Sequence, residues 1–322
     1  MPSKSKKNPI YTVSHEHMSH QPNLKRDYID QTLFILPKND GEAVRGIQIL
    51  EASKAPFIHV SNQAWGATLD NEWNQLSQNI LDKVSRVAIF EMPGLADEIN
   101  APIPKEEALK NMGLDLDIID HHHYKWVDRY CTTSSLEQLC HLIGWNMNRD
   151  DTAIAVNDRS YIAGLKSMKL SNDEIRKIRT FDLLCQGNSA SYIDRNVQQA
   201  INLIPTLEKK RRGDLWILDE PSYKQPFIVQ ELSLNTTSGL VHAFEIKPHK
   251  LGFSGCPNVV NALLDHDFSQ WEAKIGSLIT YGGGDGVVSK FWGLKLANNQ
   301  KNISRELADH VLKLVESTLG SA

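Results

Sequence analysis

Short apolar segments alternate with helical patterns along the first part of the chain, and this alternation limits the folds that it can adopt. Apolar runs of strand length occupy residues 32–36, 56–60, 86–91 and 116–120, and helical spacing covers residues 42–52, 71–84 and 105–112. This order favours an α/β fold with a mostly parallel sheet and helices on both faces. Right-handed crossovers then place the carboxyl ends of the strands at one edge of the sheet.

The remainder of the chain predicts a second and smaller domain. Helical patterns cover residues 134–145, 172–185 and 190–211, and the segment 152–165 brings Asp158 to the end of another apolar stretch. Beyond Gly213 come β-type segments at 215–218, 227–232, 240–246 and 277–281, followed by a helix over 305–319. Because 322 residues are many for one core, we expect two domains. The predicted organisation is a flexible tail (1–27), a metal-binding domain (28–190), a linker helix (191–212) and a mixed α/β substrate-binding domain (213–322).

The composition excludes several classes of partner. The net charge is −4, so nothing in it favours long duplex nucleic acid or a membrane surface. No window approaches the roughly 18 apolar residues of a membrane span, and no apolar segment follows the Lys-rich start. The Cys residues lack C-x-x-C spacing, which argues against a zinc knuckle or a disulfide framework and favours a cytoplasmic location. They are Cys131, Cys140, Cys185 and Cys256.

One stretch stands out as a candidate functional site. The apolar run that begins at Asp117 ends in Asp120, His121, His122 and His123. Carboxylate oxygen and imidazole nitrogen suit Mn, Fe, Co or Zn, and open α/β sheets bind ligands at the carboxyl ends of their strands. The sequence therefore predicts a divalent-metal site here. Three further imidazoles in the polar tail, His15, His17 and His20, could bind a metal or simply be solvated.

Further acidic residues follow other predicted strands. Asp40 and Glu42 follow the first strand, Glu91 ends the third, and Asp158 follows the later apolar stretch. Each also has a structural interpretation, since Asp40-Gly41 is typical of a turn, Glu91 could begin a helix, and Asp158 could pair with Arg159. Their common position at strand ends favours convergence with the Asp-His-His run.

The order of these clusters resembles the DHH family of phosphoesterases over nearly the whole chain. The four family motifs are similar, in order, to residues 36–42, to Glu91, to the Asp120-His121-His122 run and to Asp158. Residues 134–137 resemble the helix start that follows Asp-His-His in the family. Near the other end, residues 281–286 (YGGGDG) resemble the Gly-Gly-Gly-His loop of the associated C-terminal domain. The chain departs from the pattern at four positions, where the family has His, Asp, Asp and His: Leu36, Glu42, Glu91 and Asp285. His123 or His59 could replace the lost imidazole.

The resemblance implies metal-dependent hydrolysis of a phosphodiester or phosphomonoester, with Mn²⁺ or another divalent metal present as one or two ions. The implied substrate is a small nucleotide or a short oligonucleotide, and the assembly could be a homodimer. The implied catalytic residues are Asp120, His121 and His122. The implied metal ligands are Asp40, Glu42, Glu91, Asp120, His121 and Asp158. The implied substrate contacts are Arg159, Gly282, Gly283, Gly284 and Asp285.

Two other interpretations remain open at the level of sequence. A DHH-like protein that has lost a metal could bind a nucleotide or a partner without turnover, and the departures at Leu36, Glu42, Glu91 and Asp285 favour this. A single-metal enzyme acting on a non-nucleotide phosphate or a different bond is the third. The number of bound ions distinguishes them, because two-metal hydrolysis needs a pair of ions.

Overall fold

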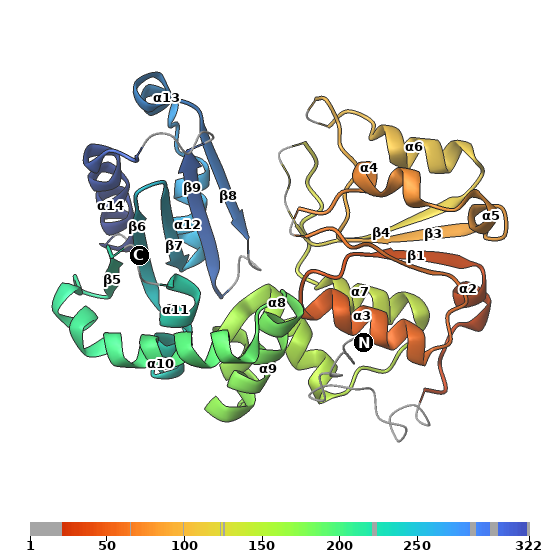
Figure 1. Cartoon of the computed structure of the whole chain (residues 1–322), viewed down its shortest axis with the longest axis horizontal. Helices are drawn as coiled ribbons and strands as arrows, with labels where there is room; N and C mark the ends of the chain where they lie inside the picture. The colour runs from red at the N-terminus through yellow and green to blue at the C-terminus, as the bar shows by residue number, and fades with distance from the viewer. Residues whose placement is uncertain are drawn as a thin grey trace, which may run out of the picture. The chain divides into compact units, whose positions relative to one another are not determined.

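The protein divides into two compact units in the computed structural model (Figure 1). The structure describes residues 21–64, 66–98, 100–122, 124, 126–220, 224–283, 288–296 and 302–320. Unit 1 consists of Met1–Asp158 and Arg176–Ser189, and unit 2 of Arg159–Ile175 and Ala190–Ala322. Each unit is built around its own sheet and its own apolar core.

Unit 1 contains a parallel four-stranded sheet, as the alternating pattern predicts. Its strands are β1 (Thr32–Leu36), β2 (Ile58–Val60), β3 (Arg86–Phe90) and β4 (Asp115–Ile119). Their order is β2-β1-β3-β4, and all three pairings are parallel. The carboxyl ends of β1, β3 and β4 therefore lie side by side at one edge, which is where the candidate functional residues follow.

Helices cover both faces of this sheet, in agreement with the prediction (Figure 1). Phe34, Ala88 and Ile119 pack on one face with residues of α3 (Gly41–Ala52) and α7 (Ser135–Ile143). Leu33 and Val87 pack on the other face with residues of α5 (Gln78–Leu81) and α6 (Pro104–Asn111). The alternation of strand side chains between these two cores fixes which face each strand residue occupies. The other helices that begin in this unit are α2 (Arg26–Asp30), α4 (Leu69–Glu72), η1 (Trp73–Gln75) and α8 (Arg149–Ser167), while α9 (Asn172–Cys185) ends in it.

Three predicted elements differ in the structure. The single helix expected over 71–84 is broken into α4, η1 and α5, because Leu76 adopts an extended conformation. The apolar stretch before Asp158 belongs to helix α8, so Asp158 lies on a helix and does not follow a strand. The β-type segment at 227–232 lies in helix α11 (Gln225–Leu234), whose residues from Phe227 to Leu234 are all buried. A helix buried on every side has no exposed polar face, so its apolar residues lack the helical spacing that would distinguish the segment from a strand.

Unit 2 contains a mixed five-stranded sheet, as predicted for the C-terminal domain. Its strands are β5 (Leu215–Leu218), β6 (His242–Lys247), β7 (Lys250–Gly255), β8 (Leu278–Gly283) and β9 (Lys290–Leu296). The order is β5-β6-β7-β9-β8, and only the β5–β6 pairing is parallel.

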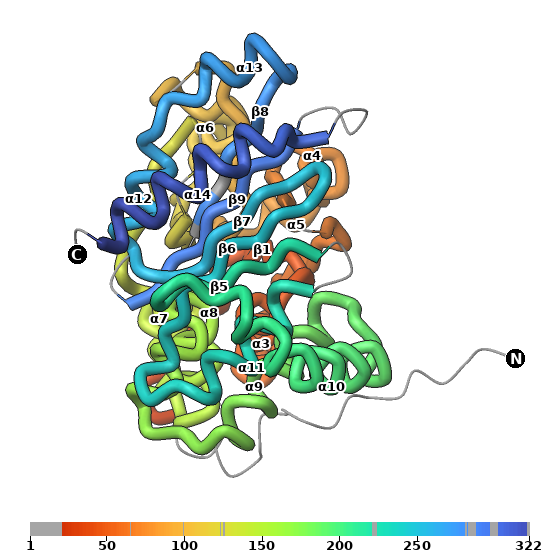
Figure 2. The backbone as a smooth tube through the Cα atoms, turned by 90° about the vertical axis from the view of Figure 1, so that its left-hand side faces the viewer, coloured from red at the N-terminus to blue at the C-terminus, as the bar shows by residue number. Residues whose placement is uncertain are grey.

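Helices α12 (Pro257–Leu264) and α14 (Arg305–Gly320) cover one face of this second sheet (Figure 2). Phe244, Phe253 and Trp292 point from neighbouring strands into the core beneath these helices. The remaining elements are α10 (Ala190–Leu207), η2 (Glu208–Lys210) and α13 (Ser269–Ile275). None of the described helices has the length and apolar character required to cross a bilayer.

Candidate metal centre

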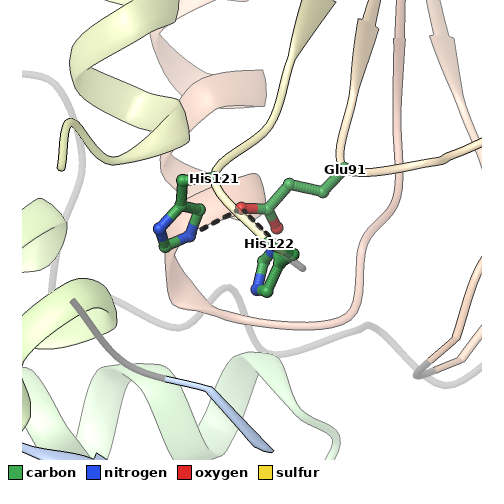
Figure 3. Close-up of side chains that lie close together, drawn as sticks. All are labelled: Glu91, His121 and His122. Atoms are coloured by element: carbon green, nitrogen blue, oxygen red, sulfur yellow. Dashed lines mark ion pairs between the residues drawn. The ribbon is translucent and has the colours of Figure 1, made fainter. Parts of the chain in front are cut away.

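Four side chains from separate elements of unit 1 converge at the edge of its sheet. Glu91 directly follows β3, and His121 lies just beyond β4, the neighbouring strand. Glu42 lies in the first turn of α3, after β1, and Asp158 projects from α8. Figure 3 shows the Glu91 carboxylate between the rings of His121 and His122. The parallel sheet thus brings together residues that are far apart in the sequence.

The imidazole of His121 is the centre of this group. Its Nε2 atom lies 2.8 Å from Asp158 Oδ2, 3.3 Å from Glu91 Oε1 and 3.7 Å from Glu42 Oε2. One ligand atom from each of these four residues lies within 4.8 Å of the others, and Glu91, His121 and His122 form a second such group. Because the two groups share Glu91 and His121, the donors of this region form one continuous site.

Several of the donor atoms are buried without a well-directed hydrogen bond among the residues that the structure describes. They are Glu42 Oε2, Glu91 Oε1 and His121 Nε2. Leaving a buried polar atom without a hydrogen bond costs about 1–3 kcal/mol, and more for a charged group. Three such atoms facing one another are the arrangement that a cation would satisfy. The set of oxygen and imidazole donors fits a divalent ion such as Mn²⁺, Fe²⁺, Co²⁺ or Zn²⁺.

The electrostatics of the centre also reflect the crowding of its carboxyl groups. Burial raises the pKa of the Glu42 carboxyl well above its usual range, and the nearby carboxylates of Asp158 and Glu91 raise it further. Burial opposes a charged His121, but the adjacent Asp158 and Glu91 raise the pKa of its imidazole to about 12. Burial likewise disfavours the ionised form of Asp158, but the hydrogen bond and positive charge of His121 lower the pKa of that carboxyl to about 2. A protonated His121 therefore supplies positive charge among three carboxyl groups, and a divalent cation would supply more.

Asp120 holds His122 in place. Its Oδ1 atom accepts hydrogen bonds from the backbone N–H of His122 and, at 3.0 Å, from the ring Nδ1 atom. Its Oδ2 atom accepts from the hydroxyl of Tyr124 at 2.9 Å. The carbonyl oxygen of Asp120 in turn accepts from the Gln138 side chain on α7. With Nδ1 committed to Asp120, the Nε2 atom of the partly exposed His122 ring is the one left to contact a ligand.

The side chain of Glu42 is held by α7, and the backbone of Glu91 has an unusual conformation. The Oε1 atom of Glu42 accepts from the backbone N–H of Leu136 at 2.8 Å, in the first turn of α7. That helix begins with a capping box formed by Ser134 and Glu137, which accounts for the predicted helix start. Glu91 has a φ angle of 49°, a conformation that is uncommon outside glycine and frequent at functional sites.

Several residues that the sequence nominates lie outside the two ligand groups. Asp40 caps α3 by accepting from the backbone N–H of Ala43 at 2.8 Å. Leu36, at the position of the family's first His, is buried in the apolar core. His59, one of the proposed replacements, pairs with Glu72 at 2.6 Å. His123, the other proposed replacement, and the tail imidazoles of His15, His17 and His20 fall outside the described residues.

The predicted substrate residues belong to unit 2. Arg159 begins the part of α8 that is assigned to this unit. Gly282 and Gly283 lie in β8, and a Cβ atom on Gly282 would come within 2.9 Å of the Phe291 carbonyl oxygen. Close approach of the neighbouring strand is therefore a structural reason for glycine at this position. Gly284 and Asp285 fall outside the described residues.

Tyr124 and Gln138 are two members of the site that the sequence pattern does not indicate. Both act by hydrogen bonding to Asp120, and Tyr124 also lies beside the His122 ring, with 6.0 Å between ring centroids. The only available signal is the position of Tyr124 close behind the imidazole run.

Comparison with known proteins gives structural likenesses only. No protein-family model matches the chain, and no curated protein matches it. Among solved structures, RecJ from Thermus thermophilus in complex with Mn²⁺ matches at a TM-score of 0.46 and 11% identity, over 98% of this chain and 56% of that one. A second structure, exonuclease RecJ bound to manganese, matches at 0.39 and 11%, over 94% and 93% of the two chains. An uncharacterized protein from Helicobacter pylori matches at 0.26 and 11%, over 89% and 99%.

The chain thus spans about half the length of the Thermus RecJ chain that it matches. At these scores and identities the likeness by itself establishes neither a common family nor a common activity.

Proposed function

We propose that this protein is a divalent-metal-dependent phosphoesterase whose active centre lies at the sheet edge of unit 1. The observation that carries the proposal is the convergence of three carboxyl groups on the His121 imidazole, with buried donor atoms that no well-directed hydrogen bond from the described residues satisfies. Glu42, Glu91, His121 and Asp158 would hold the ion. A bound divalent ion lowers the pKa of a coordinated water and neutralises charge on phosphoryl oxygens.

The residues around this group have roles that follow from their contacts. Asp120 fixes the orientation and tautomer of His122 through Nδ1, which leaves Nε2 to contact a phosphoryl oxygen or to transfer a proton. Tyr124 donates to the second oxygen of Asp120 and keeps that carboxylate from rotating. We therefore propose His122 as the residue that contacts the reacting group, and Asp120 as the residue that positions it.

The proposed substrate is a phosphodiester or phosphomonoester of a small nucleotide or short oligonucleotide. The net charge of −4 supports a small substrate, because affinity for long duplexes depends on many Lys and Arg contacts to phosphate. Arg159 and the glycine segment 282–284 with Asp285 remain the predicted substrate contacts. Homodimer formation and a cytoplasmic location likewise remain predictions. Mn²⁺ is the first ion to test, since carboxylate oxygens form most of the donor set.

Metal content and phosphoester cleavage, measured on the same preparations, test the proposal. Wild type is compared with the double variant His121→Ala/His122→Ala, and with His141→Ala as a control, since His141 is exposed on α7. Elemental analysis is paired with Mn²⁺-dependent cleavage of aryl phosphodiesters and phosphomonoesters. We expect metal and turnover in wild type and control, and loss of both in the double variant. A folded wild type that neither binds metal nor cleaves any ester would contradict the proposal.

A binding protein without turnover is the second candidate. Leu36 has no metal-ligating atom, and carboxylate oxygens of Asp40 and Asp120 accept hydrogen bonds from other groups of the protein. The remaining ligand groups overlap at Glu91 and His121, which favours one ion over two. Metal binding without cleavage in the experiment above, together with nucleotide binding in a separate titration of the same protein, would establish this alternative.

A further inference from the structure

Two imidazoles of unit 2 lie close together beside its apolar core. His266 lies between α12 and α13, and His310 lies on α14. Their Nε2 atoms are 3.0 Å apart, and their ring centroids are 5.1 Å apart with 41° between the ring planes. Both nitrogens therefore point toward the same small volume.

The spacing of the two nitrogens is close to that of a metal chelate. Zinc binds imidazole nitrogen at about 2.0–2.1 Å with tetrahedral angles, so two such nitrogens on one ion lie about 3.3–3.4 Å apart. The observed 3.0 Å differs from this by a few tenths of an ångström, which small rotations of the rings can supply. The distance between the two nitrogens is thus close to the distance that a shared ion requires.

Aromatic packing fixes both rings. His266 lies edge-on to Phe268, with 4.7 Å between centroids, and His310 lies 5.5 Å from the ring of Trp271. Phe268 and Trp271 are buried in the core of unit 2, and Val311, next to His310, is completely buried. Because the rings rest on a rigid core, little conformational entropy would be lost on binding.

We propose that His266 and His310 form a bidentate site for Zn²⁺ or a similar transition-metal ion in unit 2. Both side chains are partly exposed, so water can complete the coordination. Two nitrogen donors favour Zn, Cu or Ni over Mg or Ca, which distinguishes this site from the oxygen-rich centre of unit 1. The inference does not depend on the proposed function.

The charged neighbours of the pair are compatible with this chemistry. The Asp267 carboxylate follows His266 and accepts from the backbone N–H of Ser269 at 2.9 Å. Lys313 is the nearby cation on α14, and Lys274 lies over the Trp271 ring.

The alternative is a direct hydrogen bond between two neutral imidazoles, and Zn²⁺ binding separates the two interpretations. The full chain is titrated with Zn²⁺ against a chromophoric chelator as wild type, His266→Ala, His310→Ala and the control His141→Ala. Because other donors in the chain, including those of unit 1, are also able to bind zinc, the readout is the difference between wild type and each variant in the number of zinc equivalents bound. We expect each variant of the pair to lose the same one equivalent and the control to lose none. His310→Gln repeats the test with a side chain of similar size if His310→Ala does not fold.

Imidazole ¹⁵N spectra of the full chain give a second readout. Saturating Zn²⁺ should shift the Nε2 resonances of His266 and His310 together. Unchanged stoichiometry in the variants, or Nε2 resonances that do not respond, would overturn the proposal. The variant His121→Ala/His122→Ala should retain this equivalent, so failure of the unit 1 proposal and failure of this one are distinguishable.

Discussion

The candidate metal centre depends, at the scale of single residues, on the charge of three carboxyl groups around one imidazole. Glu42 is completely buried, and Asp158 and Glu91 approach the same His121 nitrogen. Buried charges of like sign destabilise a folded protein unless a cation compensates them. In the metal-free state this crowding is met by a protonated His121 and by a raised pKa of Glu42, and a bound cation should allow all three carboxyl groups to ionise.

Glu42→Gln should separate metal affinity from stability. Gln retains an oxygen that can accept from the Leu136 N–H but has no acidic group, so the variant avoids the cost of burying an ionisable carboxyl beside Asp158 and Glu91. We expect the metal-free variant to melt a few degrees above wild type, since about 1 kcal/mol corresponds to roughly 2–4 °C in a protein of this size. We also expect the Mn²⁺-induced rise in melting temperature to disappear. Thermal melts with and without Mn²⁺ measure both effects.

Glu51→Gln is the matched control for this prediction, because Glu51 is exposed on the same helix. It should leave both melting temperatures unchanged. A Glu42→Gln protein that melts below wild type without metal, and still gains stability from Mn²⁺, would show that Glu42 is a structural residue.

Single-residue roles could be only partly predicted from the sequence. The strand-end positions nominate Glu42, Glu91 and His121, and the structure places them in one group. In the structure the Asp40 carboxylate caps a helix and the Asp120 carboxylate accepts from His122. These contacts depend on side-chain rotamers and local turns, which the DHH-like motifs do not specify. The kink of α8 at Tyr161, just beyond Asp158, is equally invisible to periodicity.

At the scale of elements, a buried polar network joins β2 to α4. Glu72 accepts from Ser61 at 2.6 Å, from Gln63 at 2.8 Å and lies 2.6 Å from the His59 ring. Burial alone would raise the pKa of Glu72, but these hydrogen bonds lower it below its usual value. A carboxyl group with a lowered pKa in the folded state stabilises the protein above its unfolded pKa, and this contribution is lost as the pH falls through the folded value.

Glu72→Gln should therefore destabilise unit 1 in a pH-dependent way. We expect the free energy of unfolding to fall by about 1–3 kcal/mol at pH 7, because buried donors lose their charged acceptor. The difference from wild type should shrink as the pH falls below the usual glutamate pKa of about 4.3 and through the lowered pKa of Glu72 in the folded protein. Urea unfolding between pH 3 and 7 measures this, and a difference that does not vary with pH would contradict the assigned role.

A second buried network joins α9 to α3 and α8. Asp182 accepts from Arg179 at 2.7 Å and from the backbone N–H of Gly41 at 3.0 Å, and Arg179 also donates to Asn157 at 3.1 Å. Because Asn157 and Gly41 adjoin two members of the metal centre, this network positions their backbones. It was not predicted, since its members are scattered along the chain.

Asp182→Ala should cost about 3–5 kcal/mol in the free energy of unfolding, because it leaves the buried Arg179 without this acid. The exposed Asp194 on α10 provides the control Asp194→Ala, which should change the free energy by less than about 0.5 kcal/mol. Urea unfolding at pH 7 compares them. Equal stability of the two variants would show that the network is not stabilising.

The prediction of elements succeeded for several short strands and helices and failed for two helices with many buried residues. The strands over 32–36 and 215–218 and the helix over 172–185 have the predicted bounds. Helices α8 and α11 were interpreted as apolar or β-type segments because buried helices lack a polar stripe. The strands β7 and β9 were not predicted, and each contains a glycine that weakens the strand signal.

At the scale of the whole molecule, the two units have separate cores and should respond separately to metal. Mn²⁺ bound at the centre of unit 1 should raise the unfolding temperature of that unit, because a ligand stabilises only the fold that binds it. Scanning calorimetry should then show one transition that moves with Mn²⁺ and one that does not. A uniform shift of all transitions would contradict a centre confined to unit 1.

The α/β class and the division into a parallel and a mixed sheet follow from the order of strand and helix patterns, and the structure confirms them. The assignment of α8 to both units could not be predicted, because residues 152–165 were interpreted as one apolar stretch and not as a helix that a domain boundary crosses.

Anomalous X-ray diffraction from crystals containing Mn²⁺ tests the central claim most directly. The account predicts a manganese peak within coordination distance of Glu42, Glu91, His121 and Asp158, and no such peak in crystals of Glu42→Gln. A well-ordered centre without manganese in wild type, with His121 still paired to Asp158, would contradict the account.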